Sequence, residues 1–308
     1  MARSGYLFAI GAYLSWGLFP IYFKLLRPSP PAEILAHRIA WSFLVVALIV
    51  TVARNWGRVG RLVVRPGRLG AISLVSLLIG VNWFTYIYGV NTDRVVETSL
   101  GYFITPLVSV LLGVLVLRER LSPAQWVAVG IGASAVGVLT VDYGRAPYIA
   151  LILAATFGLY GLLKKRLGLP AVDGLLVESG VLALPALAVI AVLVARGNST
   201  VGEVSAGHTT LVVLSGVITA GPLLLFAGAA NRIPLSAIGL LQYLAPILQL
   251  GCGVLIYNEP MPPARLAGFG LVWLALAVFT WDGLRRVRAR TVAGRRQPDT
   301  EPAASVAG

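Results

Sequence analysis

Ten apolar stretches, each long enough to cross a lipid bilayer as a helix, occupy almost the whole chain. A transmembrane helix needs about 20 predominantly apolar residues to cross the hydrocarbon core. The stretches cover residues 5–25, 33–53, 70–90, 97–117, 123–141, 147–166, 172–195, 210–230, 236–256 and 264–283. The alternation of apolar and polar residues that marks a membrane β-barrel is not visible. The sequence therefore predicts an all-α membrane protein with ten transmembrane helices.

The shortage of charged side chains supports the same class of protein. Only 12% of the 308 residues are charged, whereas about 25% of the residues of a soluble domain are charged. The first stretch lacks a following A-x-A cleavage site, so we expect it to be retained as a membrane span. The single cysteine, Cys252, lies within an apolar stretch, where we expect it to pack and not to react.

The net charge of +13 is distributed as expected for membrane topology and not for nucleic-acid binding. A cytoplasmic N-terminus places 18 of the 25 Lys and Arg residues on the cytoplasmic side, 6 on the external side and Arg38 within a span. Cytoplasmic loops carry an excess of Lys and Arg. The sequence therefore predicts that both termini are cytoplasmic. Residues 285–308, basic and then rich in Pro, Ala and Ser, are predicted to form a disordered cytoplasmic tail that anchors the topology or contacts anionic lipid.

The two halves of the chain share their prolines, asparagines and acidic residues at an offset of 140 residues. The aligned pairs include Lys24 with Lys164, Pro30 with Pro170, Glu33 with Asp173, Asn91 with Asn231, Pro106 with Pro246, Glu119 with Glu259, and Asp142 with Asp282. This pattern predicts a duplicated five-helix unit, at 1–143 and 144–284. Because five is odd, the second unit enters the membrane from the opposite side. Inverted repeats of this kind are typical of secondary transporters.

One face of the helix expected at 97–117 combines small, polar and helix-distorting residues. The face contains Ser99, Tyr102, Pro106, Ser109 and Gly113, and the same positions in the second half are Gly239, Gln242, Pro246, Gln249 and Gly253. Such a face serves either close packing between helices or the wall of a cavity, with proline freeing a carbonyl group. We predict helix kinks at Pro106 and Pro246.

Polar residues inside the expected spans are candidates for a substrate cavity, because charges there are costly and usually face the protein interior or water. Arg38 either reaches the membrane interface through its long side chain or binds an anionic group. Glu178 binds a proton or cation, or forms an internal ion pair. The candidate cavity residues are His37, Arg38, Asn82, Trp83, Tyr102, Glu178, Gln242 and Tyr243. The aromatic side chains among them offer stacking surface, and His37 is a candidate for proton coupling.

Motifs of the common enzyme classes are missing from the sequence. It has no G-x-S-x-G motif, no Walker-type loop and no His/Cys spacing typical of a metal site. We therefore expect no enzymatic activity, no cofactor and no metal. The expected partners are a small-molecule substrate, membrane lipid and a coupling proton or ion.

Several runs resemble the RarD-type permeases, which belong to the EamA branch of the drug/metabolite transporter superfamily. The resemblance rests on YLSWGLFPIYFKLL (13–26), EILAHRIAWSF (33–43), VNWFTYIYGVN (81–91), ETSLGYFITPLVSVLLGVLVLRERLSPAQW (97–126) and LQYLAPILQL (241–250). It implies two tandem EamA domains of five helices, a bacterial cytoplasmic membrane, and export or exchange of small organic molecules. It carries over no functional residue.

Taken together, these observations predict a multi-pass permease that moves a small metabolite or drug by alternating access. Two alternatives are a membrane-embedded enzyme that modifies lipid, and a channel or scaffold without transport by alternating access. The enzyme would need a catalytic polar cluster at one interface, and a channel or scaffold would not need a repeat with matched helix breakers.

Overall fold

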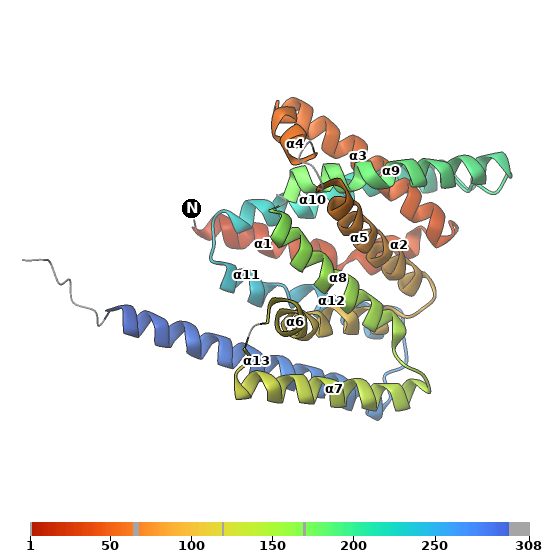
Figure 1. Cartoon of the computed structure of the whole chain (residues 1–308). Helices are drawn as coiled ribbons and strands as arrows, with labels where there is room; N and C mark the ends of the chain where they lie inside the picture. The colour runs from red at the N-terminus through yellow and green to blue at the C-terminus, as the bar shows by residue number, and fades with distance from the viewer. Residues whose placement is uncertain (1, 64–67, 119, 169–170, 296–308) are drawn as a thin grey trace, which may run out of the picture.

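The computed structural model describes residues 2–63, 68–118, 120–168 and 171–295, and these residues form helices and short connections without a β-strand (Figure 1). The helices are α1 (Ala2–Gly17), α2 (Phe19–Leu25), α3 (Pro31–Val52), α4 (Trp56–Val63), α5 (Arg68–Asn91), α6 (Val95–Leu117), α7 (Pro123–Tyr143), α8 (Tyr148–Leu167), α9 (Ala171–Ala195), α10 (Ala206–Ala230), α11 (Leu235–Leu241), α12 (Leu244–Gly251), the π-helix η1 (Cys252–Ile256) and α13 (Pro263–Arg295).

The ten predicted spans are present as helices in the described part of the chain. Nine helical segments there are long and apolar enough to cross a membrane, and the tenth predicted span contains a shorter apolar helix, Tyr148–Lys164. The first span consists of α1 and α2, and the ninth of α11, α12 and η1. The prediction of an all-α protein with ten membrane helices is confirmed. The division into two inverted repeats remains a prediction.

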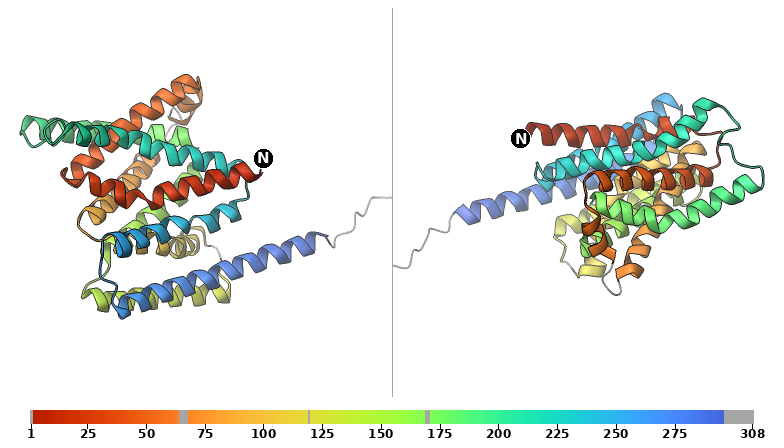
Figure 2. Two further views of the ribbon diagram at one scale, coloured as in Figure 1. Left: turned by 180° about the vertical axis from the view of Figure 1, so that it is seen from behind. Right: turned by 90° about the horizontal axis from the view of Figure 1, so that it is seen from above.

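Helices of the first half pack against their counterparts in the second half. The pairs are α3 with α9, α6 with α12, and α7 with α13. Figures 1 and 2 show α7 and α13 side by side along one edge of the bundle. Asp142 at the end of α7 accepts a hydrogen bond from Arg265 of α13 at 2.8 Å, and Asp282 of α13 accepts one from Ser122 at 2.9 Å. These contacts at opposite ends show that the two helices run antiparallel.

The break between α1 and α2 has a direct cause in the sequence. Pro20 cannot donate a backbone hydrogen bond, so the carbonyl group of Trp16 loses its usual partner four residues later. Gln249 of α12 donates its side-chain N–H to this carbonyl at 3.1 Å. Beside this contact, a Cβ atom on Gly17 would lie 2.7 Å from the Leu248 side chain. The broken first span is therefore tied closely to α12.

The two prolines predicted to kink helices have different surroundings. Pro106 lies in the interior of α6, which continues as a helix to Leu117. Pro246 lies in the first turn of α12, directly after a break at Gln242–Tyr243. A missing backbone N–H is tolerated in a first turn, because the first amides of a helix have no partner within it. The aligned prolines thus occupy an interior and a terminal helix position.

The C-terminal segment differs in part from its prediction. Helix α13 continues through Arg295, so disorder does not hold for residues 285–295. The far end of this helix projects beyond the other helices (Figure 2). Positive charges alone do not prevent helix formation, since arginine is a good helix former. Residues 296–308 lie outside the described residues.

The crossing of α3 and α10 gives a prediction about stability. A Cβ atom on Gly216 would lie 2.5 Å from the carbonyl carbon and oxygen of Trp41, whereas one on Gly221 meets nothing within 4 Å. We expect Gly216→Ala to lower the free energy of unfolding by about 1–3 kcal/mol, because the α3 backbone must move. Gly221→Ala should be neutral or stabilising by up to about 1 kcal/mol. Thermal unfolding in detergent would test this, and equal melting temperatures would contradict the described crossing.

Candidate functional site

A buried arginine with aromatic rings around it forms the centre of the candidate site. Arg38 on α3 is 4% exposed, and its guanidinium carbon lies 4.3 Å from the ring centroid of Trp83 on α5. The rings of Phe23 and Phe19 on α2 follow at 5.4 and 5.8 Å. The Nε–H group donates to the hydroxyl of Thr219 on α10 at 2.9 Å. We call these five residues the Arg38 cluster.

The described side chains that contact the Arg38 guanidinium, three aromatic rings and one hydroxyl, are all neutral. None of the ion pairs between described residues includes Arg38. A cation over aromatic rings gains about 2 kcal/mol or more when it is desolvated, which offsets only part of the several kcal/mol that burial of an ion costs. The side chain does not reach the surface, so the interpretation of Arg38 as an interfacial side chain is not supported.

Asn82 and Tyr102 join three helices next to the cluster. Asn82 on α5 donates to the carbonyl of Leu153 at 3.1 Å and to the hydroxyl of Thr156 at 3.0 Å, both on α8. Its side-chain oxygen accepts from the Tyr102 hydroxyl of α6 at 3.3 Å. Asn82 uses both of its N–H donors and one acceptor position in joining α5, α6 and α8, and it fixes the direction of the Tyr102 hydroxyl.

Glu178 forms an internal ion pair. The side chain is 1% exposed and accepts from Lys164 of α8 at 2.7 Å and from the Tyr160 hydroxyl at 3.1 Å. Lys164 also donates to the same hydroxyl at 2.5 Å. Tyr160 and Trp83 pack against the same apolar cluster, so the ion pair and the Arg38 cluster border one part of the core. Of the two readings of Glu178, the ion pair is the one present in the structure.

Three other candidate residues are not brought to the Arg38 cluster. His37 is buried on α3, and its Nε2 atom has no hydrogen-bond partner in the described part of the chain. Gln242 is exposed at the break before α12. Tyr243 packs against the apolar cluster that α13 shares with α6 and α7. The buried glutamine of this region is Gln249, which pairs with Trp16 as described above.

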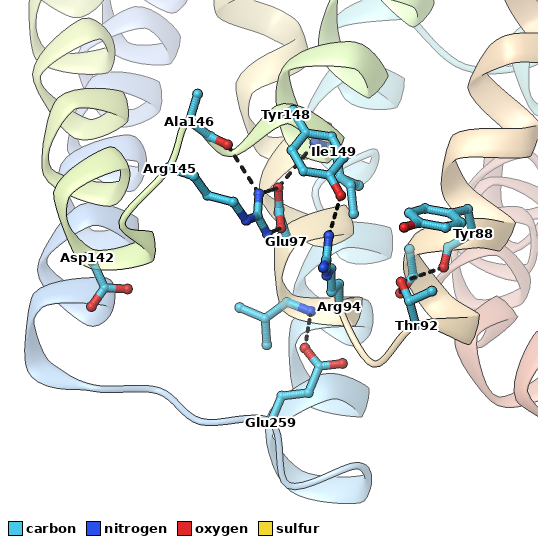
Figure 3. Close-up of polar contacts among 12 residues, drawn as sticks. Tyr88, Thr92, Arg94, Glu97, Asp142, Arg145, Ala146, Tyr148, Ile149 and Glu259 are labelled. Carbon is cyan, nitrogen blue, oxygen red and sulfur yellow. Dashed lines mark hydrogen bonds and ion pairs between the residues drawn. The ribbon is translucent and has the colours of Figure 1, made fainter.

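Carboxylates join neighbouring elements at one end of the bundle, which we call the acidic end. This end is formed by residues 26–30, 92–94, 144–147, 196–205 and 257–262. Glu259 accepts from the backbone amides of Val95 at 2.6 Å and Val96 at 2.8 Å, so it caps the first turn of α6 (Figure 3). Close to these bonds, a Cβ atom on Gly253 would lie 2.9 Å from the Val96 side chain. A carboxylate at a helix N-terminus also interacts favourably with the helix dipole.

Glu97 also joins two helices at the acidic end. Its carboxylate accepts from Arg145 at 2.8 Å and from the backbone amide of Ile149 at 3.1 Å, which joins α6 to the start of α8 (Figure 3). The hydrogen bond to Glu97 raises the pKa of Arg145 above its usual value. Glu97 therefore acts between helices and not only within α6.

Two further carboxylates connect elements at this end. Asp93 pairs with Lys24 and Arg27, and the hydrogen bond from Lys24 lowers the pKa of Asp93 below its usual value. Glu33, buried at the start of α3, accepts from the backbone amide of Thr200 at 2.8 Å and from Ser199 at 2.9 Å. The long connection 196–205 is therefore fixed on α3.

A pocket of about 400 Å³ opens between α1 and α10. Its lining consists of Phe8, Ser15, Gly221, Pro222, Leu224 and Leu225. Ser15 and Pro222 lie about one helical turn from Phe19 and Thr219 of the Arg38 cluster. Binding sites for small molecules usually have volumes of about 300–1,000 Å³. The pocket is thus of a suitable size and adjoins the cluster on the side away from the acidic end.

The described residues contain no group of three or more His, Cys, Asp and Glu side chains that could hold a metal ion. The sequence did not single out three residues of the site, Phe19, Phe23 and Thr219. It also did not predict that Glu259 joins two elements. Phe19 and Phe23 are four residues apart and so share a helix face, which is a weak signal. Glu259 stood out only through its alignment with Glu119. Thr219 gave no signal.

Comparison with known proteins places this arrangement in a family. The model of the EamA-like transporter family matches residues 3–141. The protein RarD of Streptomyces exfoliatus is 51% identical over 93% of this chain and 91% of its own length, and the protein RarD of Escherichia coli is 37% identical over 92% and 95%. An uncharacterized transporter of Bacillus subtilis, YojE, is 43% identical over 93% and 97%. One crystal structure, 20% identical, has a TM-score of 0.58 and shares the fold over 91% of this chain and 99% of its own.

Proposed function

Because the chain belongs to the RarD-type permeases of the EamA family, we propose that it moves a small organic metabolite or drug across the bacterial cytoplasmic membrane by alternating access. As a member of this family, the chain is a multi-pass membrane transporter of the drug/metabolite superfamily and not an enzyme. The direction we propose is export or exchange.

The observation that carries the proposed mechanism is the pairing of helices across the two halves. Helices α3 and α9, α6 and α12, and α7 and α13 each meet their counterpart at an offset of 140 residues. Such pairs are contacts along which the two predicted units can move against each other. Arg38 and Glu178, 140 residues apart in the sequence, lie on one of these pairs, α3 and α9, and we propose that the Arg38 cluster is the substrate site.

The distribution of charge supports an orientation. The linker 53–67 and the segment after residue 284 are rich in arginine, and their described parts, 53–63 and 285–295, lie at the end opposite the acidic end. We propose that the arginine-rich end, with both termini, faces the cytoplasm, as the excess of positive charge favours. The acidic end is then external. Its carboxylate contacts favour a state that is closed to the outside, and the pocket between α1 and α10 supports access from the cytoplasmic side.

For coupling, we propose that Glu178 exchanges a proton or cation and that its bond to Lys164 is broken during the transport cycle. Pro106 and Pro246 are proposed as points at which the two halves bend.

A channel or scaffold would not require closure at one end by carboxylates from both halves.

Transport itself is tested with the purified chain in liposomes. We expect liposomes loaded with a small-molecule extract of bacterial cells to lose or exchange at least one organic compound faster than empty-membrane controls, as followed by mass spectrometry. A comparison of exported metabolites between deletion and overexpression strains would identify the same compound. If neither experiment detects a compound that depends on the protein, the proposed function is wrong.

The closure by Glu259 gives a second test, for which the single cysteine is a natural reporter. Cys252 is 3% exposed and packs beside α2. Glu259→Gln weakens two charge-assisted hydrogen bonds, and bonds to charged groups are worth about 1.5–3 kcal/mol each. We therefore expect a membrane-impermeant thiol reagent, added outside cells, to label Cys252 about tenfold faster in this variant.

Glu203→Gln is the matched control, since Glu203 is exposed in the connection 196–205 at the same end of the bundle. It should label like the unmodified protein. Equal labelling rates for Glu259→Gln and Glu203→Gln would show that Glu259 does not hold the acidic end closed.

The role of Glu178 is tested through the response of transport to pH. We expect Glu178→Gln to insert into the membrane but to lose the dependence of flux on an imposed pH difference. The variant leaves Lys164 unpaired, and an unpaired buried charge costs about 3–5 kcal/mol. The double variant Lys164→Gln/Glu178→Gln should therefore recover stability without recovering the pH response. A normal pH response in either variant would reduce Glu178 to a structural ion pair.

A further inference from the structure

Most N–H donors of Arg38 have no hydrogen-bond acceptor among the described residues. A guanidinium group carries five N–H donors, and the described residues supply one hydrogen-bond acceptor, the hydroxyl of Thr219 at 2.9 Å from Nε. The faces of Trp83, Phe23 and Phe19 cover the charge but accept no hydrogen bond of ordinary strength. Buried polar groups are almost always hydrogen-bonded, to protein or to another molecule. The remaining guanidinium donors make no hydrogen bond to a described residue, so they are available to a further acceptor.

A second donor beside the cluster has no partner either. Tyr86 on α5 is 3% exposed, and its hydroxyl is buried without a hydrogen-bond partner among the described residues. Its ring lies 5.9 Å from Phe23 and 5.8 Å from Tyr102. The Arg38 guanidinium lies 5.4 Å from the centroid of the same Phe23 ring. The ring that carries the unpartnered hydroxyl and the unpaired cation therefore both contact Phe23.

Two other tyrosines beside the cluster already have partners. The Tyr22 hydroxyl donates to the carbonyl of Leu211 at 2.8 Å. The Tyr102 hydroxyl donates to Asn82 at 3.3 Å, and both amide N–H groups of Asn82 are used by α8. Glu178 is paired with Lys164. No described carboxylate forms an ion pair with Arg38.

On the premise that the chain is a transporter, we propose that its substrate is an organic anion whose carboxylate binds Arg38 and Tyr86. A carboxylate offers two oxygen atoms in the geometry that suits a guanidinium fork, and one of them also accepts from the Tyr86 hydroxyl. The rest of the substrate is apolar or aromatic, because Trp83, Phe19 and Phe23 form the walls of the site. The pocket between α1 and α10 begins one turn away and is lined mostly by apolar residues, which suits the same class of molecule.

The test compares acids with their uncharged isosteres on the purified full-length chain in detergent. The probes are benzoate, phenylacetate and hexanoate, each paired with its primary amide, and the readouts are calorimetric Kd values and the shift in melting temperature. We expect at least one carboxylate to bind and its amide to bind at least about tenfold more weakly, since a hydrogen bond to a charged group contributes that factor or more. Equal binding of acids and amides, or no binding of any acid, would overturn the proposal.

Variants locate the bound group. Arg38→Lys keeps the charge but loses the planar fork, so we expect at least about tenfold weaker carboxylate binding. Tyr86→Phe removes only the unpartnered hydroxyl and should weaken binding by about fivefold to tenfold. The matched control is Tyr143→Phe, which removes another buried and unpartnered hydroxyl, on α7 beside Arg265. If Tyr86→Phe and Tyr143→Phe change carboxylate binding to the same extent, the site at Arg38 is excluded.

Transport measurements separate this inference from the proposed function. Flux of a neutral or cationic compound that Arg38→Lys leaves unchanged would refute the organic-anion site while the transporter stands. Carboxylate binding that depends on Arg38, combined with no flux of the bound acid in liposomes, would keep the site and refute its role in transport.

Discussion

Charged side chains inside an apolar helix bundle need partners from another helix, and this need determines much of the structure. Glu178 is held by Lys164, Asp142 by Arg265, and Glu259 by the amides at the start of α6. In each case the two partners belong to different elements of the chain, two helices or a connection and a helix. A buried charge without its partner costs about 3–5 kcal/mol. These contacts therefore fix which helix ends lie together, in a bundle whose apolar surfaces alone would allow many arrangements.

The spans themselves could be predicted from the sequence because one physical quantity dominates them. A membrane helix requires a long apolar stretch, and the chain offers ten, so the predicted boundaries differ from the helices by only a few residues. Local detail was less accessible. The break after Gly17 depends on Gln249, 233 residues away, which supplies the hydrogen bond that Pro20 removes. The sequence does not predict helix α4 or the extension of α13 to Arg295, because both segments are rich in arginine and lack a long apolar stretch.

The candidate site could be predicted only in part, for a related reason. Arg38, Asn82, Trp83, Tyr102 and Glu178 stand out as polar or aromatic residues within apolar stretches, and the structure gathers four of them around or next to the Arg38 cluster. Which of them are already saturated depends on contacts between distant segments, such as Asn82 with α8. Gln242 aligns with Tyr102 of the first half, but it is exposed at the break before α12, and Tyr243 packs against the cluster of α6, α7 and α13. Hydroxyl-bearing residues such as Thr219 are common in membrane helices, so their presence in an apolar stretch does not predict a binding site.

The comparison of Arg38 with Glu178 shows how two related halves can make one site. Both residues lie about two turns inside their helices, α3 and α9, which pack against each other. Glu178 is neutralised by Lys164, whereas the residue aligned with Lys164 in the first half, Lys24, is bound instead to Asp93 at the acidic end. Arg38 is consequently left with aromatic rings and one hydroxyl. An acid at position 38 with Lys24 beside it would form an ion pair like that of Glu178 and Lys164. Because Lys24 is bound to Asp93 and position 38 is an arginine, Arg38 has no carboxylate partner among the described residues, and such a cation suits the anionic substrate that we propose.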